Sequence, residues 1–449
     1  MSCFSALLAV CAISNMSVSQ NWPWDSRVII DYTLTGEQGK TYDLDLQIQD
    51  PTGQPVSCWS GAFNDDDLIN VAPGAHRLVW NPEKMTGSAD SAAIGMKFTL
   101  TCKEAETAGK YMVIGLAGPA NDTVEYLNDV PAGGWTEEHM TSKMVFRRIR
   151  PGYFQMGSPT NEVGHLDKRN SGYKGLDCQG EAQHPVLLTN EYWIAICPAT
   201  YSQICYIDDR SKYDGAGAPK VTEGSAIDYS WSQSGKRYPI RTLNLIRLVG
   251  ENNVTSWPTS TDVGADSIIG QMRTRLAGKG APTGLVLSLP TQAQWEYACR
   301  AGTTTAWNNG TDCNPDETTG VDVNLDLLGI YQPLGGTAVL TGNVCQKKPN
   351  AWGLYDCHGL VGEVVYGHGA QNNATTAETE PTSGGCTADM YCSIRGGWYN
   401  QCYAVHCRSA AKIHDNQYGN KGKTAYTSSG RNHSVRFAFI HPRHNGVWE

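Results

Sequence analysis

The residues best suited to recognition chemistry lie near the C-terminal end of the chain, in a stretch with few aliphatic side chains. Tyr and Trp offer large, rigid contact areas, and Asn, His and Arg add adaptable hydrogen bonds. A solvated loop can have the same composition, so both interpretations stay open from the residues alone. The candidate ligand-binding residues are Trp398, Tyr399, Asn400, Gln401, Tyr403, His406, His414, Asn416, Arg431 and Asn432.

Cysteines form the second group of reactive side chains. The chain has 15 of them, a content that fits an oxidising compartment and several disulfides. Cys58 and Cys102 are the only cysteines between residues 20 and 116, so the sequence predicts a disulfide between them. No Cys-x-x-Cys pair occurs, which argues against a zinc ribbon or a thioredoxin-type site.

Composition excludes several classes of function. The formal net charge is −9, which argues against nucleic acid or an anionic membrane surface as the main partner. Beyond the N-terminus no apolar run is long enough to span a bilayer. A phosphate-binding P-loop and the GxSxG motif of hydrolases are both absent from the sequence.

The elements that must position these residues begin with one short helix, LPTQAQWEYACRAG at 289–302. Thr291 is a suitable N-cap, and Gln294 completes a capping box. Gly302 is a suitable C-terminal stop. We expect the helix to be a rigid support for the glycine-rich loops that follow it. The apolar spacing predicts one buried stripe, formed by Trp295, Ala298 and Cys299.

The N-terminal segment 1–19 has the features of a secretion signal. An apolar stretch, Phe4–Ile13, precedes a small-x-small sequence at 17–19, although no Lys or Arg comes before it. The alternative is a buried first strand. Export to the cell surface or the medium is the prediction that follows from the first interpretation.

Strand signals dominate the next part of the chain. Apolar residues alternate with polar ones at 28–32, 42–48 and 94–100, and Pro-Gly and Asn-Pro turns lie between them. This pattern predicts a small all-β, sandwich-like domain at 20–116. A polar, glycine-rich linker is predicted at 117–143, a second domain at 144–442 and a tail at 443–449.

The second domain carries a specific series of motifs. MGSP at 156–159 is followed by LPTQAQWEYACRAGT, NAWGLYDCHG at 350–359, RGG at 395–397 and CRSA at 407–410. In this order they resemble the formylglycine-generating enzyme, or sulfatase-modifying factor, family over about two-thirds of the chain. The resemblance implies an α+β, C-type-lectin-like fold with little regular secondary structure. A sandwich-like leader before such a domain is similar to an arrangement in secreted bacterial proteins.

The family resemblance leaves the function open. Some members oxidise a sulfatase cysteine to formylglycine with a copper-binding cysteine pair. Others are parts of iron-dependent sulfoxide synthases, which need a histidine-bearing helical domain that this chain lacks. A third group consists of non-catalytic binders, including variable proteins whose C-terminal loops form the recognition surface.

The resemblance marks Cys402 and Cys407 as the candidate catalytic pair. Four residues separate them, as in the oxidases, and copper(I) prefers soft thiolate ligands. However, Cys407 directly precedes the Arg408-Ser409-Ala410 segment, whereas several residues intervene in the oxidases. Cys407 therefore matches the structural cysteine of non-oxidase relatives, either buried or disulfide-bonded, with Cys299 as one possible partner.

The resemblance also implies a calcium site in the loop GLYDCHGLVGEVV. Carried over by position, Asp356 and Glu363 would supply carboxylates, and Gly359 and Val361 would supply backbone carbonyls, which are the hard oxygen ligands that calcium prefers. The alternative is that the acids only accept backbone N–H groups. The family's GNVWEW is Gly-Leu-Val-Gly-Glu-Val here, so this domain has been repacked.

Together these observations predict an exported binding protein that recognises a protein or a glycan through its C-terminal loops, with calcium holding the frame. The first alternative is a copper-dependent formylglycine-generating oxidase that acts on a sulfatase cysteine. The second is a structural component of a cell-surface assembly.

Overall fold

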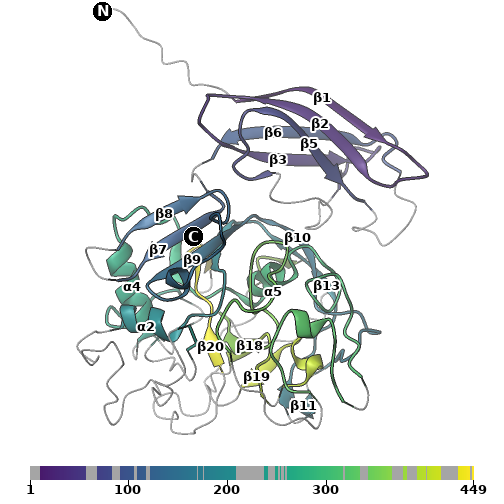
Figure 1. The fold of residues 1–449 in the computed structure, drawn as a ribbon. Coiled ribbons are helices and arrows are strands. Elements are labelled where there is room, and N and C mark those ends of the chain that lie inside the picture. Colours follow the sequence, from purple (N-terminus) through teal and green to yellow (C-terminus); the bar gives the residue numbers. More distant parts are fainter. Residues whose placement is uncertain are drawn as a thin grey trace, which may run out of the picture. The chain divides into compact units, whose positions relative to one another are not determined.

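The computed structural model describes residues 11–56, 68–82, 92–105, 109–117, 122–168, 170–174, 176–208, 237–240, 248–250, 253, 257, 260–316, 319–333, 342–366, 378–381, 392–400, 402–415, 433–444 and 447–448. The chain divides into two compact units. The first comprises Met1–Lys110 and Tyr126–Asp129, and the second comprises Tyr111–Glu125 and Val130–Glu449. Figure 1 labels the elements of each unit.

The first unit is a sandwich of two three-stranded sheets, as the sequence predicts. One sheet has the order β1 (Ala12–Gln20), β2 (Val28–Thr35), β5 (Gly74–Trp80). Alternate residues of the strands point into a shared apolar core, because successive side chains of a strand lie on opposite faces. The second sheet has the order β4 (Pro55–Val56), β3 (Tyr42–Gln49), β6 (Lys97–Glu104).

The first strand overlaps the predicted secretion signal. Residues 12–20 pair with β2 in antiparallel register, from Ala12 with Thr35 to Gln20 with Val28. The alternative interpretation expected a buried first strand; these residues do form a strand, but none of the nine is buried. Export stays a prediction, and cleavage after Ser19 would remove most of β1 from its sheet.

The expected Cys58–Cys102 disulfide concerns one residue outside the described part of the chain, Cys58. Cys102 is a free thiol on β6, and it lies close enough to Cys11 for the two side chains to interact. In the described structure the neighbour of Cys102 is therefore Cys11.

The second unit starts earlier than predicted, at Tyr111. Strand β7 (Tyr111–Gly115) pairs with β9 (Lys143–Ile149) throughout its length. The predicted linker also contains β8 (Val124–Leu127) and the 3-10 helix η3 (Glu137–Met140). The apolar run of β7 is buried at all five positions, so it belongs to a core and not to a connection. The sheet order is β15 (Val286–Ser288), β21 (Ala438–Ile440), β14 (Tyr192–Ala195), β9, β7, β8.

A second six-stranded sheet carries the C-terminal motifs. Most of its neighbouring strands are antiparallel, but β16 and β20 run parallel to each other. Its order is β11 (Asn170–Tyr173), β12 (Leu176–Cys178), β19 (Ile413–Asp415), β18 (Cys392–Arg395), β16 (Gly362–Val364), β20 (His433–Val435).

The predicted helix is present as α5 (Gln292–Arg300). Thr291 Oγ accepts the Gln294 N–H at 3.1 Å, and Gln294 Oε1 accepts the Thr291 N–H at 2.9 Å. The helix ends at Ala301, in left-handed conformation with φ 45°, one residue before the predicted stop. All nine helical residues are buried, so the burial exceeds the single stripe that the sequence predicts. The helix lies beside β10 and β13 (Figure 1).

The remaining elements are short, which agrees with the predicted α+β class of few helices and many small strands. No helix among the described residues is long and apolar enough to cross a membrane. These elements are β10 (Gly152–Met156), β13 (His184–Leu188), β17 (Glu378–Thr379), β22 (Arg443–His444), β23 (Val447–Trp448), α2 (Tyr201–Ile207), α4 (Ile268–Leu276), η5 (Leu325–Leu327) and η6 (Ala404–His406).

Candidate functional site

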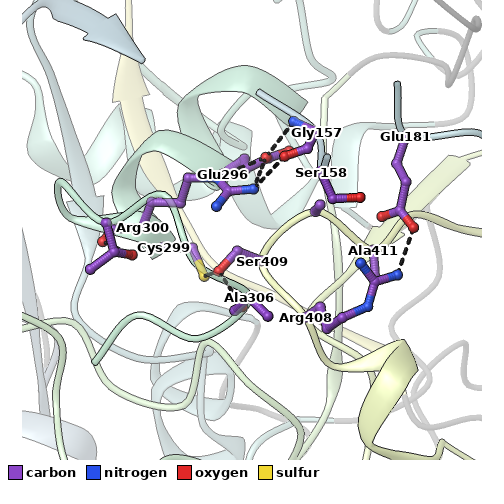
Figure 2. A network of polar contacts seen from close by, with 12 residues as sticks. Gly157, Ser158, Glu181, Glu296, Cys299, Arg300, Ala306, Arg408, Ser409 and Ala411 are labelled. Carbon is purple, nitrogen blue, oxygen red and sulfur yellow. Dashed lines mark hydrogen bonds and ion pairs between the residues drawn. The ribbon is translucent and has the colours of Figure 1, made fainter. Parts of the chain in front are cut away.

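The motifs that lie far apart in the sequence meet in a buried ionic network (Figure 2). At its centre is Glu296 of α5, which is fully buried. Its Oε1 accepts the Gly157 N–H at 2.8 Å and two N–H groups of Arg300 at 2.8 and 3.0 Å. Its Oε2 pairs with Arg395 at 3.0 Å. One carboxylate thus joins the MGSP loop, the helix and the RGG segment.

Arg408 forms the second centre of the network. Its guanidinium pairs with Glu162 and Glu181, and the distance to Glu181 is 2.6 Å. It also donates to the carbonyls of Gly164 and Val405 at 2.6 and 3.0 Å. Because this arginine belongs to the CRSA motif, it connects the C-terminal segment to the segment 162–181.

Opposite charges keep the network ionised in spite of burial. Burial alone would raise the pKa of Glu296, but the positive charges of Arg300 and Arg395 hold that pKa below its ordinary value. Burial and the neighbouring Arg395 lower the pKa of Lys412 to about 8. A buried charge that loses its partner costs roughly 3–5 kcal/mol, so these pairs specify one arrangement of the loops.

The candidate catalytic cysteines are inside the protein. Cys402 and Cys407 are both free thiols with no exposed surface. Burial raises the pKa of each thiol well above its ordinary value. Copper(I) binding needs thiolates, so protonated, enclosed thiols suit a structural role better than an open metal site.

The backbone closes over Cys407 from two directions. A Cβ atom added at Gly397 would lie 2.6 Å from the Cys407 sulfur. The Cys407 carbonyl accepts a hydrogen bond from His358 Nδ1 at 2.8 Å. The Asn308 N–H donates to His358 Nε2 at 3.3 Å, so both ring nitrogens have a backbone partner. His358 therefore connects the segment 402–407 to the interior of the second unit.

Cys299, the suggested disulfide partner of Cys407, has other neighbours. Its sulfur lies 3.7 Å from Ser409 Oγ and 3.9 Å from His358 Nε2. Ser409 in turn donates to the Ala306 carbonyl at 2.9 Å (Figure 2). Cys299 and Cys407 are both free cysteines in this structure, so no disulfide joins them.

The predicted calcium ligand Glu363 has no free oxygen. Its Oε1 pairs with Arg436 at 2.6 Å, and its Oε2 accepts N–H groups of Arg436 and Trp295 at 2.8 and 2.6 Å. The carboxylate is fully buried, and Arg436 already balances its charge. A calcium ion at Glu363 would have to displace this arginine, so the donor set does not fit the ion there.

The other three predicted calcium ligands take part in backbone geometry. Asp356 Oδ2 accepts the Cys345 N–H at 2.7 Å, as the alternative interpretation expected of these acids. The Gly359 carbonyl accepts the Val361 N–H at 2.9 Å. At Gly359, with φ 83°, a Cβ atom would lie 2.3 Å from the Ile330 carbonyl oxygen, so the turn needs glycine.

Three predicted recognition residues are not available for contact. Trp398, Tyr399 and His406 are exposed by 6%, 9% and 1%. Trp398 packs edge-on against His433, and His406 stacks against Tyr403. The prediction is corrected at these three positions, because their rings fill the interior beneath the loop.

The remaining recognition residues divide into three groups. Asn400 and Tyr403 are half-buried and lie beside or within the thiol loop, residues 402–407, so they retain surface for contact. The backbone of His414 lies in β19, where it pairs with Ser393. The others lie outside the described residues: Gln401, Asn416, Arg431 and Asn432.

Several residues of the network are not predicted by any sequence motif. Glu162 and Glu181 balance Arg408, yet neither stands in a motif that announces an ion pair. Arg436, the partner of Glu363, also stands outside the motifs. The arginines of the motifs were the available signal. If they are buried, each must pair with an acidic residue elsewhere in the chain.

Comparisons with known proteins agree with the motif order. A family model described as "Sulfatase-modifying factor enzyme 1-like domain" matches residues 135–419. None of the curated proteins matches the chain. Among solved structures, the chain is similar to "Treponema denticola variable protein 1", with 14% identity, a TM-score of 0.42, and coverage of 66% of this chain and 95% of that one.

Two further solved structures are similar to the chain. One is "Structure of PvdO from Pseudomonas aeruginosa", with 18% identity, a TM-score of 0.38, and coverage of 66% and 94% of the two chains. The other is "Crystal Structure of CarF", with 15% identity, a TM-score of 0.34, and coverage of 65% and 98%. Because the family model spans more than half of the sequence, the chain belongs to the sulfatase-modifying factor, or formylglycine-generating enzyme, family.

Proposed function

We propose that this protein is a binding member of its family, which recognises a protein or a glycan through C-terminal loops without catalytic turnover. The observation that carries the proposal is the enclosure of Cys402 and Cys407. An oxidase needs two thiols that face a bound substrate cysteine, whereas these sulfurs have no exposed surface. Burial also favours their protonated, unreactive form.

The ionic network supports a recognition role by making the loop frame rigid. Arg408 ties the CRSA segment to Glu162 and Glu181, and Arg395 donates to three successive carbonyls at 409–411, at 3.2 to 3.4 Å. A binding loop loses less conformational entropy when its frame is already fixed. Asn400 and Tyr403 lie on this frame and supply an amide and a phenol for contact.

Copper(I) titration of the reduced full-length protein tests the oxidase alternative. We expect no stoichiometric, tight binding that depends on the pair, so the wild type, Cys402→Ser and Cys407→Ser should give the same titration. Cys205→Ala is the matched control, because Cys205 is a buried cysteine of helix α2. Tight binding of one copper ion per chain that is lost only in the Cys402 and Cys407 variants would contradict the proposal.

A screen of the full-length protein against a glycan array and a panel of cell-surface proteins tests recognition itself. Once a ligand is found, Asn400→Ala and Tyr403→Ala should each weaken binding by roughly tenfold, which is the typical effect at an interface residue of medium importance. Lys279→Ala, an exposed position after α4, is the control and should leave the affinity unchanged. Equal affinities for all four proteins would remove the proposed surface.

We also propose that the protein works outside the cytoplasm, where its cysteine content is favoured. N-terminal sequencing of the protein from its native cell tests this together with the fate of β1. Recovery from the medium or the cell surface is the expected result. Recovery from the cytoplasm alone would contradict it.

A further inference from the structure

Cys197 and Cys345 are two thiols that neither the proposed binding role nor the family resemblance uses. They stand far apart in the sequence, yet the Cys345 and Cys197 side chains lie close enough to interact. Both are reduced in this structure. Their contact joins the end of strand β14 to the segment that leads into the NAWGLYD motif.

Backbone hydrogen bonds fix the two segments in place on either side of this contact. The Tyr355 N–H donates to the Ile196 carbonyl at 2.7 Å, next to Cys197. The Cys345 N–H donates to Asp356 Oδ2 at 2.7 Å, next to Tyr355. The two cysteines therefore lie against the same pair of residues, 355–356, and their proximity follows from the fold.

The conformation of Cys345 is itself held by the protein. Its φ is 59°, a left-handed value that L-residues other than Asn and Asp seldom adopt. Asp356, whose carboxylate accepts the Cys345 amide, is also left-handed, with φ 57°. Such backbone conformations persist only where surrounding contacts stabilise them. The Asp356 carboxylate therefore holds the Cys345 backbone in this conformation.

Access distinguishes this pair from the other adjacent thiols of the second unit. Cys345 is half-buried and precedes Gln346, which is exposed, whereas Cys197 is only 4% exposed, so a small molecule would reach this pair through Cys345. Cys299 and Cys357 also adjoin each other, but they are exposed by only 1% and 3%. We therefore expect reagents in solution to react with the first pair long before the second.

We propose that Cys197 and Cys345 are a modification site, at which a small-molecule disulfide converts the two thiols into a disulfide bond. In two exchange steps the cysteines lose their S–H protons and form one S–S bond. The S–S bond of the reagent accepts the two electrons, and two thiol molecules are released. The new bond fixes segment 345–356 to the end of β14, and it is independent of the proposed binding function.

Peptide mapping of the full-length protein after treatment with oxidised glutathione tests this site. Chymotrypsin separates Cys197 in 194–201 and Cys345 in 332–352 from every other cysteine of the chain. We expect a linked pair of these peptides that disappears after reduction. Burial raises the pKa of Cys345, so the reaction is run above pH 8 to increase the thiolate fraction.

Variants and a melting experiment make the outcome decisive. Cys197→Ser and Cys345→Ser should each abolish the linked peptide, whereas Cys205→Ala should keep it. Oxidation should raise the Tm of the wild type by roughly 5 °C or more, because the bond closes a long loop, and should not change the Tm of Cys345→Ser. Two alkylated, unlinked peptides from the oxidised wild type would overturn the proposal, even if a variant fails to fold.

Discussion

Single charged residues decide much of this fold, because the second unit buries them instead of displaying them. Glu296, Glu363, Arg395, Arg408 and Arg436 are each exposed by 1% or less. Ionised side chains are very rarely buried to this degree unless they are paired. The pairs are therefore positional constraints, and each one brings together segments that are distant in the sequence.

The Glu363–Arg436 pair offers a test of this view. Glu363→Gln leaves Arg436 without its counter-charge in the interior, so we expect the free energy of unfolding to fall by about 3–5 kcal/mol. Urea unfolding followed by fluorescence measures the change. Lys143→Ala removes one partner of an exposed pair with Glu138, 39% and 66% exposed, and should cost less than about 1 kcal/mol. Similar losses of stability in both variants would show that a buried ion pair is no more important for folding than an exposed one.

Asp356 gives a prediction about pH. Burial raises the pKa of this carboxyl group to about 6, against an unfolded value of about 3.9. Between these values the folded protein binds more protons than the unfolded chain, so this residue makes the protein more stable as the pH falls. The effect is about 2 kcal/mol between pH 7 and pH 4.

Replacement of Asp356 by Asn should remove this contribution while it keeps an acceptor for the Cys345 amide. The difference in unfolding free energy between the wild type and Asp356→Asn should therefore change by about 2 kcal/mol over that range, in favour of the wild type at low pH. Urea unfolding at four or five pH values measures it. Parallel pH profiles for the two proteins would contradict the raised pKa.

At the scale of elements, the loops are defined by close approaches of backbone and less by regular secondary structure. The RGG segment passes so near the thiol loop that a side chain at Gly397 would meet the Cys407 sulfur. Helix α5 is short, but all of its residues are buried. Through Glu296 it connects the MGSP loop and the RGG segment. A support of this kind tolerates few changes of shape.

Gly397→Ala separates the close approach from backbone conformation. Gly397 and Gly310 both have left-handed φ, 68° and 84°, but a Cβ atom at Gly310 has nothing within 4 Å. Gly310→Ala should therefore cost about 1 kcal/mol from its φ alone. Gly397→Ala should cost roughly 2–3 kcal/mol more, because the interior cannot absorb an added methyl group freely.

Thermal or urea unfolding of the two glycine variants measures these costs. If both lose the same stability, the segment around Cys407 is looser than the structure indicates. The thiol loop would then have room to open, and the structural role of Cys407 would have to be reconsidered.

At the scale of the whole molecule, the border between the two units lies at Lys110 and Tyr111. Strand β7 belongs to the second unit because its side chains fill that core. Tyr111 also receives the guanidinium of Arg147 over its ring, 5.2 Å from the centroid. Each fully buried large apolar side chain of such a strand contributes roughly 2 kcal/mol.

Two fragments test this border. A chain of residues 111–449 keeps β7 and should unfold in one cooperative transition. A chain of residues 117–449, which starts at the border that the composition suggests, loses β7 and leaves one edge of β9 unpaired. We expect the shorter fragment to aggregate or to melt at least 10 °C lower, since several buried side chains are missing. Equal melting temperatures would place the border at 116.

The sequence determined by itself the features that depend on local chemistry and on order along the chain. Helix 292–300 follows from its capping box, the sandwich strands follow from alternation of apolar residues, and the family follows from the motif order. The composition did not predict the border at residue 111, because β7 is a short apolar run. Such a run can occur in a linker as well as in a core strand. The composition also did not predict the burial of Trp398, Tyr399 and His406. Aromatic and polar side chains occur both on surfaces and in interiors where their polar atoms find hydrogen-bond partners.

Only the tertiary structure decided which partners the charged and thiol side chains have. Glu363 has the carboxylate that a calcium ligand needs, but Arg436, which directly follows β20, occupies both of its oxygens. Cys402 and Cys407 have the spacing of an oxidase pair, but segments at 358 and 397 enclose the latter. Coulomb interactions and desolvation depend on distances through space, and chain order does not specify those distances until the fold brings the segments together.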